Sequence, residues 1–124
     1  MKYTIYQIQL TDAQYDTINA EGHDAVPAHV AKLKMTMDFS GDKIGGLAYD
    51  AFYNDYYTHV ANIEANDPNE VFEIGNIGPE ENIERLTRMS SLSVGDIIVD
   101  EEGQCIVVAP VGFVAFSFNP KMAA

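Results

Sequence analysis

The sequence predicts an α+β fold in one domain, residues 1–124, of the size commonest for domains. Three observations support this class. The chain opens on an alternating apolar run, helical spacing of apolar residues follows, and the last third holds β-branched runs separated by turn residues. We expect an N-terminal strand, three to four short helices, and a C-terminal antiparallel β-meander or small SH3- or PUA-like barrel.

The first strand is predicted over residues 2–10. Tyr3 and Ile5 fall on one side of the alternation, and Tyr6 and Ile8 fall on the other. Because both faces are apolar, we expect this strand to be central or well covered on both sides.

Two helices are expected next. Thr11 and Gln14 have the spacing of a capping box, and Gly22 is a natural stop for the helix that they open. A second helix is predicted over residues 24–37, with Pro27 in its first turn. One apolar stripe is predicted to face the core, formed by Val26, Val30, Leu33 and Met37.

The third helix is predicted over residues 47–58. It would place Tyr49, Tyr53 and Tyr57 in one line. Tyrosine brings a large rigid area with a polar tip, so this line is a candidate partner-binding face. Packing of the rings at the edge of the core is the alternative. Residues 59–65 fit either a continuing helix or a strand.

The remaining elements are read from turn signals. Residues 71–74 fit a short strand or a helical turn, and Pro79 opens a short helix that ends near Leu86. Residues 94–100 and 104–109 predict a hairpin, because an acidic glycine turn separates two β-branched runs. A last strand is expected over 112–118.

The chain is strongly acidic, with a net charge of −12. Because nucleic-acid backbones attract lysine and arginine patches, direct binding to DNA or RNA is disfavoured. Residues 64–103 concentrate the carboxylates. The candidate interaction residues among them are Glu70, Glu73, Glu80, Glu81 and Glu84. They form either a solvated surface or a face that meets a basic protein surface.

The sequence offers little catalytic chemistry. His23, His29 and His59 do not have zinc-ligand spacing, and the glycines do not form a phosphate-binding loop. Cys105 has no disulfide partner and lies in an apolar run, which is typical of a buried thiol in a reducing compartment. We therefore expect no enzyme activity, cofactor or metal. We also expect no secretory signal or membrane span, and a cytoplasmic location.

One family resemblance begins at residue 91. The run Ser91-Leu92-Ser93-Val94-Gly95-Asp96-Ile97-Ile98-Val99, the following acidic glycine turn, and the ending Val111-Gly112-Phe113 resemble the YodL-like domain of phage, plasmid and bacterial proteins. The preceding stretches 71–74 and 83–86 look like its lead-in, so the resemblance covers about 70–118. Pro110-Val111 departs from the usual polar and aromatic pair. The resemblance implies a phage or mobile-element origin and names no reaction.

These observations favour an uncharacterised accessory protein that binds a host or viral protein through its acidic residues, located in the host cytoplasm if a phage encodes it. An inhibitor or a DNA mimic is the sharper version. One alternative is a ligand-binding or catalytic barrel with a pocket near Gly95-Asp96 and Gly112-Phe113. Another is a self-assembling structural component.

Overall fold

The computed structural model describes residues 1–117. Within them the strands are β1 (Lys2–Ile8), β2 (Tyr57–Glu64), β3 (Ile83–Arg85), β4 (Ile97–Val99), β5 (Cys105–Val108) and β6 (Phe113–Phe116). The α-helices are α1 (Asp12–Glu21), α2 (Pro27–Thr36), α3 (Ile44–Tyr53) and α4 (Pro68–Asn76), with 3-10 turns η1 (His23–Ala25) and η2 (Glu80–Asn82). Phe118, the predicted end of the last strand, lies outside the described residues.

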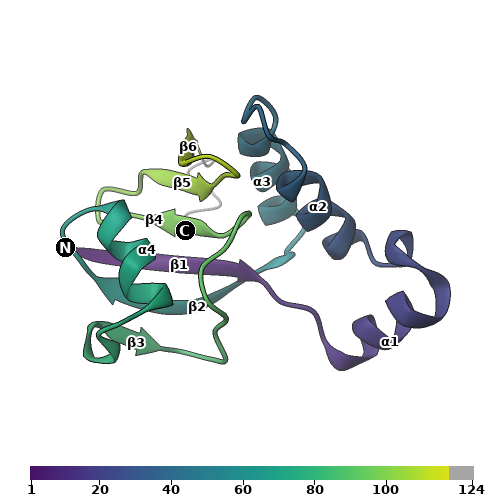
Figure 1. Ribbon diagram of the computed structural model, residues 1–124, viewed down its shortest axis with the longest axis horizontal. Helices are drawn as coiled ribbons and strands as arrows, with labels where there is room; N and C mark the ends of the chain where they lie inside the picture. Colours follow the sequence, from purple (N-terminus) through teal and green to yellow (C-terminus); the bar gives the residue numbers. More distant parts are fainter. Residues whose placement is uncertain (118–124) are drawn as a thin grey trace.

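The strands form one antiparallel sheet in the order β3-β2-β1-β4-β5-β6, so the predicted α+β class is confirmed (Figure 1). The strand β1 lies between β2 and β4, as its two apolar faces predicted. The strands β4, β5 and β6 follow each other as the predicted meander. The sheet is open, with β3 and β6 at its edges, and this selects the meander over the barrel.

Apolar side chains cover the sheet from two sides. On one side, Tyr3 and Ile5 of β1 pack with Val71 and Ile74 of α4. We call this cluster the α4-side core. On the other side, Ile8 packs in a cluster with residues of α2 and α3, among them Met35, Ala48 and Ala51. The alternation predicted for β1 therefore divides the molecule into two cores.

Local signals fix several helix ends. The Thr11 side chain accepts a hydrogen bond from the Gln14 backbone N–H at 3.1 Å, and the Gln14 side chain accepts one from the Thr11 N–H at 2.8 Å. The predicted capping box is therefore present, and α1 ends before Gly22, whose φ of 102° suits glycine. The Asp67 side chain caps α4 in the same way, accepting from the Glu70 N–H at 2.8 Å.

The predicted third helix was wrong at its end. The helix α3 stops at Tyr53, the chain turns through Asn54 and Asp55, and Tyr57 already belongs to β2. Asp55 has a φ of 60°, a left-handed conformation that interrupts the helix. The open choice for residues 59–65 is thereby settled as strand over 57–64.

Two further segments differ from the sequence prediction. Residues 71–74 lie within α4, so the helical alternative holds there. The predicted helix after Pro79 is only the turn η2, and residues 83–85 form the edge strand β3. Pairing with β2 selects the strand there, and such a tertiary contact overrides local helix preference.

The predicted apolar stripe of the second helix was right at Val26, which is buried, and wrong at its far end. The helix α2 buries Ala28 and Met35, whereas Leu33 and Met37 are exposed. Ala31 packs beside Ala28 and Met35, so the face at positions 28, 31 and 35 is the one turned to the core. Among residues 1–117, no helix has the length and apolar character needed to cross a membrane.

Candidate interaction surface

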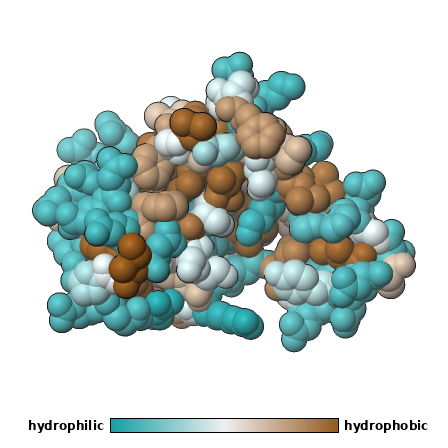
Figure 2. Space-filling model, in the orientation of Figure 1, coloured by the Kyte–Doolittle hydropathy of each residue, from teal (hydrophilic) through white to brown (hydrophobic). Residues whose placement is uncertain are grey.

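The acidic candidates gather around one edge of the sheet. Glu70 and Glu73 lie on α4, Glu80 and Glu81 in η2, and Glu84 on β3. These elements meet because α4 packs on β2 and β3 pairs with β2. We call these five residues the acidic end. Figure 2 shows mainly hydrophilic residues, with one hydrophobic patch among them, at the end of the molecule where α4 and β3 lie.

The carboxylates of the acidic end surround the sheet edge and do not form one line. Ile83 belongs to the α4-side core, so the alternation of β3 directs Glu84 to the opposite side of the sheet. There Glu84 accepts a hydrogen bond from the Asn62 side chain at 2.6 Å. Glu70 and Glu73 lie on the α4 side. A partner would therefore meet negative charge from both sides of the edge.

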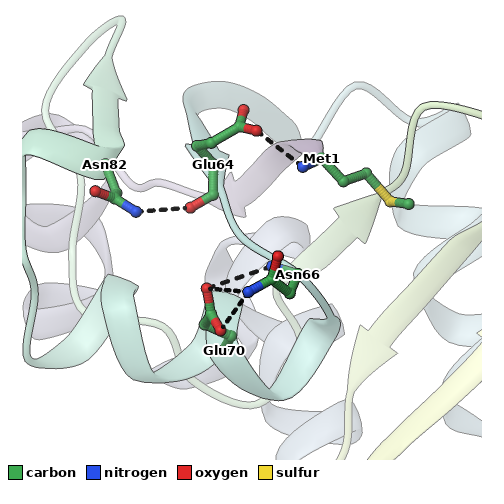
Figure 3. A network of polar contacts seen from close by, with 5 residues as sticks. All are labelled: Met1, Glu64, Asn66, Glu70 and Asn82. Carbon is green, nitrogen blue, oxygen red and sulfur yellow. Dashed lines mark hydrogen bonds and ion pairs between the residues drawn. The ribbon is translucent and has the colours of Figure 1, made fainter.

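Three of the five carboxylates already have partners. Glu80 binds Arg85 through two bonds of 2.5 and 2.9 Å, and the Arg85 guanidinium lowers the pKa of the Glu80 carboxyl. Figure 3 shows Glu70 accepting from Asn66, with its Oε2 at 3.2 Å from the Asn66 Nδ2. Glu84 is held by Asn62.

Figure 3 also shows how Glu64 ties the start of the chain to this end of the sheet. Its side chain pairs with the Met1 amino group at 2.8 Å, and its backbone carbonyl accepts from the Asn82 side chain at 3.1 Å. Glu73 and Glu81 are exposed, and no ion pair or hydrogen bond holds their carboxylates within residues 1–117. These two side chains are the ones most available to a partner.

The structure does not bring the tyrosine line together. Tyr49 and Tyr53 contact each other on α3, with ring centroids 4.7 Å apart, and Tyr53 is 46% exposed. Tyr57 points into the molecule from β2, where its hydroxyl donates to the Gly95 carbonyl at 2.5 Å. Burial raises the pKa of Tyr57. Tyr57 is therefore a core-edge residue, and the line is reduced to the exposed Tyr53 and the half-buried Tyr49.

The two candidate surfaces lie on different parts of the molecule. The helix α3 packs against β5 and β6, at the opposite edge of the sheet from β3. The acidic end and the Tyr49–Tyr53 pair are separate surfaces.

The segment that carries the family resemblance has a structural role here. Asp96 is 2% exposed, and its Oδ2 accepts from the Ser93 N–H at 2.9 Å and from the Gln7 side chain at 3.0 Å. Gln7 also exchanges two bonds with the Ser90 backbone, at 2.9 and 3.1 Å. Burial raises the pKa of Asp96 to about 6, although both bonds oppose the shift. These bonds attach residues 90–96 to β1.

Sequence reasoning missed Gln7. The available signal was its position, because it continues the face of Tyr3 and Ile5 and is a polar residue in a strand expected to be covered. A buried polar side chain requires a hydrogen-bond partner. The sequence could not show that the partners would be Ser90 and Asp96, more than eighty residues away.

The other chemistry-bearing residues are dispersed. His23 and His29 contact each other, Nδ1 to Nε2, at 3.0 Å, whereas the His59 ring bonds Asn62 at 2.9 Å. Cys105 is buried, as its apolar context predicted. Within residues 1–117, no three histidine, cysteine or acidic side chains converge on a point that could hold a metal ion.

No protein-family model, curated protein or solved structure matches the chain. The resemblance to the YodL-like domain therefore stays a prediction.

Proposed function

We propose that this protein is a protein-binding module whose acidic end contacts a basic surface on a partner protein. The observation that carries the proposal is the convergence of carboxylates from α4, η2 and β3 on one sheet edge, where the nearby Arg85 is already paired with Glu80. Like the resemblance to the YodL-like domain, an origin in a phage or mobile element is part of this proposal. A cytoplasmic partner of the host or the virus fits that origin.

The electrostatic part of the proposal has a defined consequence. Complementary charge accelerates encounter more than it increases final affinity, and salt weakens it. We expect partner binding to fall steeply between low and physiological salt. A DNA mimic would need carboxylates along one face, and Glu84 lies on the side opposite to α4. We therefore propose a basic protein surface that meets the edge, in preference to a DNA-binding groove.

The test reverses charge where it does not disturb the fold. The double variant Glu73→Lys/Glu81→Lys changes the two unpaired carboxylates and raises the net charge from −12 to −8, since each reversal adds two. The matched control Asp16→Lys/Glu21→Lys makes the same change on exposed positions of α1. Tagged proteins are used to capture partners from bacterial lysate at low and high salt, with identification by mass spectrometry.

We expect a partner that the unmodified protein and the α1 control retain at low salt, and that the Glu73/Glu81 variant loses. A partner retained by the Glu73/Glu81 variant would contradict the proposed surface. Equal loss from both variants would show that only the overall charge matters, and would also contradict it. Far-UV circular dichroism of each variant confirms that the fold is intact.

A further inference from the structure

A second surface has the opposite charge. A cleft of about 210 Å³ lies between the start of α1, the helix α2 and the segment that joins β3 to β4. Figure 2 shows a notch at the lower edge of the molecule between the α1 part and the rest. The side chains that matter here are Leu10, Asp12, Tyr15, Lys32, Arg88 and Ser90.

The cleft concentrates cations in an acidic protein. The chain has seven lysines and arginines, of which one, Lys121, lies outside the described residues, and two of the other six line this cleft. Ion pairs within residues 1–117 use Met1 and Arg85, so no described carboxylate lies within 4.0 Å of the charged groups of Lys32 or Arg88. With Asp12 counted, the cleft has a net charge of +1.

The walls of the cleft are amphipathic. Tyr15 is 53% exposed and Leu10 is partly buried, so an apolar surface lies beside the two cations. The volume is below the ~300 Å³ at which sites for drug-sized ligands begin. A ligand that fits is therefore small, with one anionic group and a compact apolar part.

We propose that this cleft binds a small organic oxyanion, with its carboxylate or phosphate group at Lys32 and Arg88 and its apolar part against Tyr15. The net charge of −12 repels anions at a distance, so binding depends on these two local cations. Arg88 presents a planar fork of donors that suits an oxyanion. The cleft shares no residue with the acidic end, and this inference is independent of the proposed function.

The test uses benzoate and phenyl phosphate as probes, which separate the carboxylate from the phosphate source. Binding is followed through backbone amide shifts of Tyr15 and Ser90 in ¹⁵N-labelled protein, with sodium chloride at equal ionic strength as the reference. We compare Lys32→Gln and Arg88→Gln with the matched control Lys34→Gln, which removes the same charge from α2 but lines the groove between α2 and α3 instead.

We expect saturable shifts with at least one probe. Each cleft variant should weaken binding about fivefold or more, which corresponds to roughly 1 kcal/mol per ion pair. The Lys34→Gln variant should bind like the unmodified protein.

Absence of saturable shifts with both probes would overturn the proposal. Equal weakening by Lys34→Gln would overturn it as well, because binding would then depend on the total charge of the protein and not on the two cations of the cleft. Lys32 also acts on the buried Asp96 carboxylate, so Lys32→Gln alone could disturb the fold. Arg88 is exposed on a connecting segment, and Arg88→Gln keeps the test decisive if Lys32→Gln does not fold.

Discussion

The helices α1 and α4 have nearly the same length and the same kind of start, but different support. Side chains cap both N-termini. The helix α4 buries Val71 and Ile74 in the α4-side core, whereas α1 buries only Ile18 and lies to one side of the sheet in Figure 1. The difference teaches that similar capping residues can begin two helices that differ greatly in how much they pack against the rest of the fold. We infer that core packing stabilises α4. The helix α1 is stabilised largely by the hydrogen bonds that cap its own two ends.

The largest expected effect tests this difference directly. Ile74→Ala should lower the free energy of unfolding by about 4 kcal/mol, because Ile74 is 4% exposed within the α4-side core. Ile18→Ala should cost about 2 kcal/mol, near the low end for such a truncation, because little of α1 packs around it. Urea unfolding measures both values. A loss from Ile18→Ala as large as that from Ile74→Ala would contradict the comparison.

A second prediction concerns pH and the bonds that attach residues 90–96 to β1. Burial raises the pKa of Asp96 from 3.8 to about 6. Between these values the folded protein binds the proton more tightly than the unfolded chain, so this group makes stability fall as pH rises from about 4 to about 6. The change is about 3 kcal/mol for a shift of about two units.

Replacement of Asp96 isolates that contribution from the other carboxylates. In Asp96→Asn the side-chain oxygen can still accept from Ser93 and Gln7, but nothing titrates there. We expect the stability difference between the variant and the unmodified protein to change by about 3 kcal/mol between pH 4 and pH 7, in favour of the variant at pH 7. Urea unfolding at a series of pH values gives this difference. A constant difference would show that Asp96 does not titrate in this range.

The features predicted correctly from the sequence are those that depend on residues close together in the chain. Capping at Thr11 and Gln14 and the hairpin turn near Gly103 are set by residues close in the chain, and both were predicted correctly. The prediction that Tyr57 continues the helical line of tyrosines was wrong. The four-residue spacing of the tyrosines continues across Asn54 and Asp55, but the backbone turns there. Asn-Asp is a turn signal, and weighing it above the tyrosine spacing would have ended the helix in the right place.

The remaining features depend on contacts between residues far apart in the chain, which local sequence patterns do not indicate. Nothing near residues 83–85 indicates that they form an edge strand, because β2 supplies their partners. The acidic end was located by composition alone, but its division between two sides of the sheet depends on the alternation of β3. The cleft at Lys32 and Arg88 joins residues 56 positions apart, and only the folded arrangement places them together.

The smallest expected effect distinguishes how the two caps act. Thr11→Ala and Asp67→Ala each remove one side-chain cap, worth about 1 kcal/mol. Because α1 is weakly packed, the amides of residues 12–21 should exchange through a local opening whose free energy lies below that of global unfolding, and Thr11→Ala should lower it further. Because α4 is part of a core, its amides should exchange only through global unfolding, and Asp67→Ala should lower that free energy. Native-state hydrogen exchange separates the two patterns, and exchange of residues 12–21 at the same free energy as the sheet amides would mean that α1 unfolds together with the sheet.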